Sequence, residues 1–106
     1  MEYFIYQLKL APFYRKELNW TEQTRQIISM HFNYLKKNCD AGKVLLAGRT
    51  NLSIEDDNNS GICIFKAESA NVARNFMDND PAVLNGVMTA RLFPFSLALL
   101  NKQTEE

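Results

Sequence analysis

The chain has 106 residues, of which 46% are hydrophobic and 23% are charged, which is the composition of a globular protein and not of a disordered one. This length suits one domain with one core, so we expect a single domain over residues 1–106. Twelve basic and twelve acidic residues cancel, which argues against a protein that binds nucleic acid by neutralising its phosphates.

The first forty residues predict a strand followed by a long helix. Apolar character alternates along residues 3–10, as expected for a strand, whereas residues 11–20 show no regular pattern. Thr21 is suited to cap a helix over about residues 22–40, because its hydroxyl can accept a hydrogen bond from a free backbone N–H. Gly42 is suited to end that helix, because glycine readily adopts the left-handed conformation needed there.

This helix carries one continuous apolar face, which predicts that it packs against a sheet. The face consists of Ile27, Ile28, Met30, His31, Phe32, Tyr34 and Leu35. His31, the only histidine of the chain, lies near the centre of this face.

The middle of the chain predicts a hairpin of two strands. Residues 43–49 form a short apolar run suited to a buried strand, and residues 61–67 form a second strand with apolar groups on both faces. Residues 51–60 between them are polar and acidic and are typical of a hairpin loop.

The last part of the chain predicts a second helix and a final strand. Ser69 is suited to cap the helix, and Asp80 with Pro81 ends it, because a residue before proline avoids helical geometry. Residues 87–96 predict the last strand. The order β-α-β-β-α-β predicts an α+β fold in which two helices cover one face of a four-stranded sheet.

The other face of the predicted sheet also carries apolar side chains, which must be covered in some way. The simplest cover is the same face of a second copy, so we expect a homodimer. The alternative is a monomer whose open face carries scattered apolar groups, which protein surfaces tolerate.

His31 and Asp80 are the candidates for proton transfer. A neutral imidazole can both give and take a proton near pH 7, and a carboxylate beside it would fix its tautomer. We expect the two residues to converge at the mouth of a cleft. The alternatives are a structural histidine satisfied by one hydrogen bond and an Asp80 that only shapes its own turn.

Other residue types narrow the chemistry further. Two cysteines and one histidine cannot supply four zinc ligands, and the acidic loop lacks the final glutamate of a calcium-binding loop, so no metal is expected. Cys39 and Cys63 should be free thiols in a signal-less cytoplasmic chain, with Cys63 serving packing more than chemistry. No apolar run is long enough to span a membrane. Arg49 could bind an anion, although a solvated or salt-bridged arginine is the simpler interpretation.

The same segments resemble the YciI-like, or YCII-related, family over about residues 3–98. The resemblance lies in an ordered set of short motifs: H31-F-N-Y-L35, G42-K-V-L-L-A-G48, G61-I-C-I-F65, A67-E-S69, D80-P-A-V83, G86-V-M and L92-F-P-F95. It implies a ferredoxin-like fold, a dimeric α+β barrel, and a site centred on His31 and Asp80. Many members carry proline where this chain has Arg49, and some carry an acid at the position of Asp40, which therefore competes with Asp80 as the partner of His31.

The sequence thus predicts a small cofactor-free enzyme that uses His31 and Asp80 for acid/base chemistry on a small organic molecule, with Arg49 in substrate binding. Two alternatives stay open. One is a non-catalytic module that binds a small ligand, and the other is a cofactor-independent monooxygenase on the same barrel.

Overall fold

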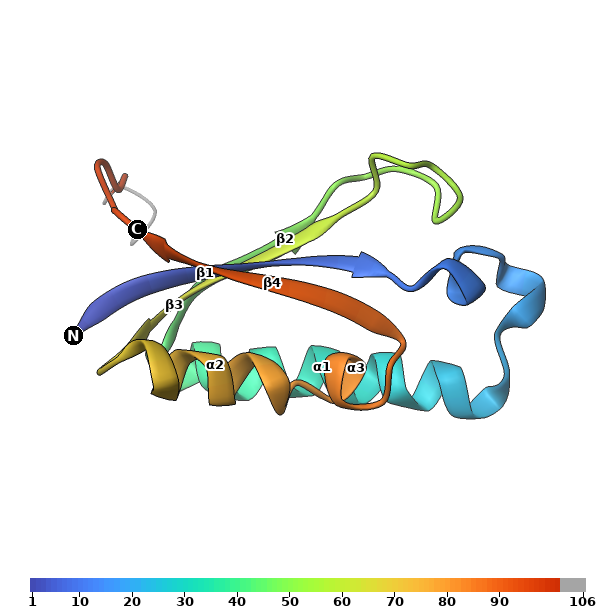
Figure 1. Ribbon diagram of the computed structural model, residues 1–106, viewed down its shortest axis with the longest axis horizontal. Helices are drawn as coiled ribbons and strands as arrows, with labels where there is room; N and C mark the ends of the chain where they lie inside the picture. Colours follow the sequence, from blue (N-terminus) through green and yellow to red (C-terminus); the bar gives the residue numbers. More distant parts are fainter. Residues whose placement is uncertain (102–106) are drawn as a thin grey trace.

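The computed structural model describes residues 1–101 and contains a four-stranded antiparallel sheet with its helices on one side (Figure 1). Residues 102–106 of the predicted domain lie outside the described residues. The elements, with η for a 3-10 helix, are β1 (Glu2–Leu10), η1 (Pro12–Arg15), η2 (Glu17–Asn19), α1 (Glu22–Asp40), β2 (Val44–Arg49), β3 (Gly61–Ala67), α2 (Ala70–Asp78), α3 (Pro81–Leu84) and β4 (Met88–Phe95). The strand order is β2-β3-β1-β4. This arrangement is a ferredoxin-like α+β fold, as the sequence predicts.

The core lies between the sheet and the helices and is built on the alternation of β1. Phe4, Tyr6 and Leu8 of β1 are at most 4% exposed. Phe4 pairs with Phe65 of β3, and Tyr6 pairs with Cys63, so these four side chains leave the same face of the sheet. Both β3 residues are fully buried. Because β1 is a central strand, its buried side chains reach the middle of the core.

Helix α1 begins and ends where its sequence signals predict. The Thr21 hydroxyl accepts a hydrogen bond from the backbone N–H of Thr24, whose own hydroxyl accepts from the N–H of Thr21, which forms a reciprocal cap. Gly42 has a φ of 85°, in the left-handed region that glycine tolerates. The predicted apolar face is wider than the buried one, because Met30 is 52% and Phe32 64% exposed.

Strand β2 corrects one prediction. The sequence predicts a buried strand over residues 43–49, but β2 lies at the edge of the sheet and pairs only with β3. Val44 is its one buried residue. Strand order is set by tertiary packing, so an apolar run alone does not separate an edge strand from a central one.

Helix α3 is absent from the sequence prediction. Helix α2 ends at Asp78, two residues before the Asp80-Pro81 pair predicted to end it, and Asp80 instead caps a new helix, because its Oδ1 accepts a hydrogen bond of 3.0 Å from the N–H of Ala82. Pro81 follows as the first helical residue, a position at which proline is favoured. This four-residue helix places Asp80 between α1 and the sheet, where α1 and α3 pack together.

The second face of the sheet carries no helix in the described part of the chain (Figure 1). Leu46, Ile64, Ile5 and Phe93 are in register and form an apolar row across all four strands. Leu46 is 43% and Phe93 36% exposed, so part of this row faces solvent. None of the helices in residues 1–101 is long and apolar enough to span a bilayer.

Candidate functional site

His31 and Asp80 are in contact although they come from different helices. The Nδ1 atom of His31, in the middle of α1, lies 2.7 Å from Oδ1 of Asp80, at the start of α3. A carboxylate only accepts hydrogen bonds, so the ring donates from Nδ1. The neutral ring then has its lone pair on Nε2. The structure therefore brings together the two residues that the sequence singled out.

Asp80 is hidden, whereas His31 reaches the surface. The side chain of Asp80 is 0% exposed and that of His31 is 13% exposed. Asp80 Oδ1 accepts from His31 and from the N–H of Ala82, and Oδ2 accepts a hydrogen bond of 2.8 Å from the hydroxyl of Tyr6. A buried carboxylate needs several such donors to be tolerated. A ligand could thus touch His31 but not the acid behind it.

The groups around the pair are held in their neutral forms. Burial raises the pKa of Tyr34 to about 12, and the nearby Asp80 and Cys63 add to the effect. Burial also raises the pKa of the Cys63 thiol to about 12, although a hydrogen bond with Tyr6 works in the opposite direction. A thiol with such a high pKa is a poor nucleophile. Cys63 is therefore a packing residue, as the sequence analysis expects.

The acid that competes with Asp80 lies elsewhere. Asp40, the last residue of α1, accepts a hydrogen bond of 2.9 Å from Nζ of Lys36, and both side chains are exposed. This is an ordinary pair of residues four apart on a helix surface. His31 takes Asp80 and not Asp40 as its partner.

Arg49 lies at the end of β2 on the side of the sheet that the helices cover. It pairs with Gly61, which pairs with the buried Leu8, so Arg49 and Leu8 leave the same face. Ala47, one position earlier on that face, is exposed like Arg49. The helix layer therefore leaves this end of β2 open. The Nη1 atom of Arg49 donates to the carbonyl of Thr50 at 3.3 Å, and no hydrogen bond within residues 1–101 links it to His31 or Asp80.

The facing side of α1 is more covered than this end of β2. Ile27, Ile28 and His31 are partly buried, and Thr24 is the one buried residue of this helix. Helix α1 and strand β2 are in contact. The first half of α1 and the last part of β2 thus present partly open surfaces on the same side of the sheet.

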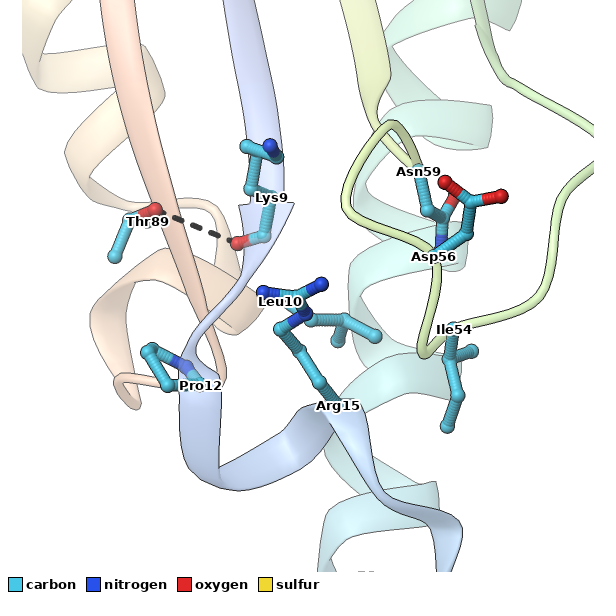
Figure 2. Close-up of a pocket in the computed structure, with 8 residues that line it drawn as sticks. All are labelled: Lys9, Leu10, Pro12, Arg15, Ile54, Asp56, Asn59 and Thr89. Carbon is cyan, nitrogen blue, oxygen red and sulfur yellow. Dashed lines mark hydrogen bonds between the residues drawn. The ribbon is translucent and has the colours of Figure 1, made fainter.

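A separate cavity of about 210 Å³ lies at the end of β1 (Figure 2). Figure 2 shows Arg15 and the end of β1 on one side of this cavity and the β2–β3 loop on the other. Arg15 forms an ion pair with Asp57 of that loop, and Nζ of Lys9 donates to the Asp57 carbonyl. The cavity is lined by Lys9, Leu10, Pro12, Arg15, Ile54, Asp56, Asn59 and Thr89.

A second cavity of about 350 Å³ lies by Gly42 and Lys66, and neither cavity is lined by His31 or Asp80. The cleft expected beside the pair therefore stays a prediction. Within residues 1–101, no group of three or more histidine, cysteine or acidic side chains could hold a metal ion.

The family follows from a match over most of the chain. The model of the YCII-related domain matches residues 1–96. The chain belongs to the YCII-related domain family. The resemblance in the ordered motifs is thus confirmed. Comparison of this YCII-related domain with curated protein sequences finds no match.

A solved structure with a similar fold is that of 5-chloro-2-hydroxyhydroquinone dehydrochlorinase from Burkholderia phenoliruptrix, in complex with 2,5-dihydroxybenzoquinone. The two chains align with a TM-score of 0.65 and 20% sequence identity. The alignment covers 91% of this YCII-related domain and 95% of the dehydrochlorinase. At this identity the likeness establishes the shared fold.

Tyr6 is the residue of the site that the sequence analysis missed. It lies in the regular apolar alternation of residues 3–10, which predicts a strand and gives no sign of a role in a site. Its hydroxyl is the available signal, because a buried tyrosine O–H normally needs a hydrogen-bond partner. The sequence does not say which acceptor that would be.

Proposed function

We propose that this YCII-related domain is a small enzyme in which His31 acts as a general acid/base on a small organic molecule, oriented by Asp80. The observation that carries the proposal is the 2.7 Å contact between His31 Nδ1 and Asp80 Oδ1. Because Asp80 accepts the Nδ1 proton, Nε2 is left to take a proton from a substrate. The same carboxylate would stabilise the imidazolium that forms.

The proposed reaction is an elimination, and the likeness in fold to the dehydrochlorinase supports it. That neighbour is a dehydrochlorinase, and its structure holds a dihydroxylated quinone. In the proposed reaction the substrate loses one proton to His31 Nε2. The electron pair left behind forms a new double bond, and chloride or another anion leaves with the electrons of its bond. Proton transfer by a histidine and an acid requires no bound cofactor.

Arg49 is proposed to bind an anionic oxygen of the substrate. It is exposed on the helix side of the sheet, where its guanidinium makes a weak contact with the adjacent backbone carbonyl of Thr50. A guanidinium is suited to pair with a carboxylate or phenolate oxygen through two parallel hydrogen bonds. A hydroxylated aromatic acid or phenol is therefore the proposed substrate class.

A second copy of the chain is proposed to cover the open face of the sheet, in the dimeric arrangement expected from the sequence. The apolar row of Leu46, Ile64, Ile5 and Phe93 supports this, because a sheet face of this character is costly to leave in water.

A cytoplasmic location is also proposed. Cys39 and Cys63 are both free and Cys39 is exposed, which suits the reducing conditions of the cytoplasm.

The test is an activity screen with matched variants. Purified protein is mixed with chlorinated and unchlorinated hydroxyquinols, and chloride release, proton exchange with heavy water and oxygen uptake are followed. We expect chloride release or proton exchange with the unmodified protein and a loss of at least about a hundredfold in His31→Gln, the usual scale for a general acid/base. Lys36→Gln, on the outer surface of α1, is the control and should keep full activity.

Other outcomes point to the alternatives. Ligand binding without turnover, equal in the His31→Gln variant, would favour the non-catalytic binding module. Oxygen uptake coupled to quinol loss would favour the monooxygenase.

A further inference from the structure

The hydroxyl of Tyr6 occupies a place where an apolar atom would pack as well. Tyr6 is 0% exposed and lies in the centre of β1. Its ring meets Phe65 edge-on at 5.7 Å and Phe76 at 6.2 Å between centroids, so aromatic packing fixes the ring on its own. Phenylalanine would make the same ring contacts. What the hydroxyl adds is the 2.8 Å hydrogen bond to Asp80 Oδ2.

With this bond, both carboxylate oxygens of Asp80 accept hydrogen bonds. The N–H of Ala82 and Nδ1 of His31 both contact Oδ1, at 3.0 and 2.7 Å. Rotation of a carboxylate about its last bond is soft, so donors on one oxygen leave the plane of the group poorly defined. Tyr6 holds the second oxygen from the opposite side, from the sheet, whereas the other two donors come from helices.

We propose that Tyr6 is a positioning residue, which holds Asp80 so that His31 keeps its proton on Nδ1 and presents Nε2. This inference rests on the proposed function of His31. Tyr6, Asp80 and His31 then form one line of hydrogen bonds from the middle of the sheet to the surface. Tyr6 contacts no substrate, because Asp80 and the core enclose it.

Tyr6 acts in this line as a fixed donor and not as a proton carrier. Burial, followed by the charges of Cys63 and Asp80, raises the pKa of Tyr6 far above that of a free phenol. The hydroxyl therefore keeps its proton at any pH at which the protein works. Cys63 of β3, the cross-strand neighbour of Tyr6, lies beside this line.

The experiment reads the tautomer of His31 directly. Because His31 is the only histidine, nitrogen-15 NMR of the imidazole shows a single ring, and it needs no substrate. At alkaline pH the unmodified protein should carry its proton on Nδ1. Tyr6→Phe should shift part of the population to the Nε2 tautomer and lower kcat by about tenfold with KM unchanged, which corresponds to about 1.4 kcal/mol in the barrier.

Tyr34→Phe is the matched control. Tyr34 is also a tyrosine of this core, but its hydroxyl donates at 2.8 Å to the backbone carbonyl of Phe76 and not to Asp80. Its removal should leave the His31 spectrum unchanged. If Tyr6→Phe also leaves the spectrum unchanged, Tyr6 is only a core residue and the inference is overturned, whether or not the protein turns out to be an enzyme.

If Tyr6→Phe does not fold, the unmodified protein still decides the question. The Tyr6 hydroxyl proton should then be protected from exchange with water and give a resolved NMR signal, because it is buried and bonded to Asp80. A rapidly exchanging hydroxyl would overturn the inference.

Discussion

Replacement of Asp80 by asparagine removes the charge of the site while it keeps the shape of the side chain. The N–H of Ala82 donates to Oδ1 and is fixed by α3, so the amide oxygen of asparagine should occupy that position. The amide nitrogen then takes the place of Oδ2 and faces the hydroxyl of Tyr6. The asparagine N–H and the Tyr6 O–H are both donors, so the Tyr6 hydroxyl must rotate to accept a hydrogen bond from the amide.

The expected loss of stability is the sum of two effects. The turned Tyr6 proton is left without an acceptor at a site that is 0% exposed, and an unsatisfied buried donor costs on the order of 1–3 kcal/mol. The hydrogen bond from His31 also loses its charge, and charge-assisted bonds are roughly twice as strong as neutral ones, which adds about 1 kcal/mol. We therefore expect Asp80→Asn to lower the free energy of unfolding by about 2–4 kcal/mol.

Equilibrium unfolding in urea, followed by circular dichroism at neutral pH, measures this change. Asp78→Asn, at an exposed position at the end of α2, is the control and should change the free energy by less than about 0.5 kcal/mol. A double-mutant cycle with Tyr6→Phe should show losses that are less than additive, because either change breaks the same bond. Additive losses, or an Asp80→Asn variant as stable as the control, would refute the reasoning.

Two further predictions concern pH and assembly. The pKa of Cys63 is raised from 9.0 to about 12, so above pH 9 the unfolded chain loses this proton before the folded one does. The free energy of unfolding should then fall with a slope that approaches about 1.4 kcal/mol per pH unit between pH 10 and 12, and the raised pKa values of Tyr34 and Tyr6 add to the fall above pH 10. Urea titrations between pH 8 and 10 should show a total fall from Cys63 of about 1.4 kcal/mol, which should be missing in Cys63→Ala; an equal slope in both proteins would contradict this. Light scattering should give about twice the chain mass of 12.2 kDa, and Phe93→Glu should reduce it to one chain mass; a monomer before the substitution would exclude the proposed dimer.

Local signals in the sequence were sufficient for most of the fold. The cap at Thr21 and the glycine at position 42 fixed the ends of α1, because both act through backbone geometry within a few residues. The contact of His31 with Asp80 could also be predicted, because a histidine on an apolar helix face needs a polar partner. Its catalytic role stays a prediction.

What the sequence could not supply depends on contacts between distant segments. Helix α3 has four residues, which is too short for a periodic pattern, although the Asp80-Pro81 pair is a helix-start signal as well as a stop signal. The exposure of Phe32 follows from the placement of α1, which no pattern within the helix records. The bond from Tyr6 to Asp80 spans 74 residues, so alternation along β1 cannot reveal it.

The place of β1 in the sheet also constrains how the chain can fold during synthesis. β1 is made before both of its neighbours in the sheet, β3 and β4, which follow only after α1 and β2. Such non-local pairing is slow to form, and an unpaired apolar strand is prone to aggregation. A nascent or truncated chain that ends before β4 would leave one edge of β1 without its partner. Strand β4 is therefore the element that completes the pairing of β1 on the side of Tyr6 opposite to β3.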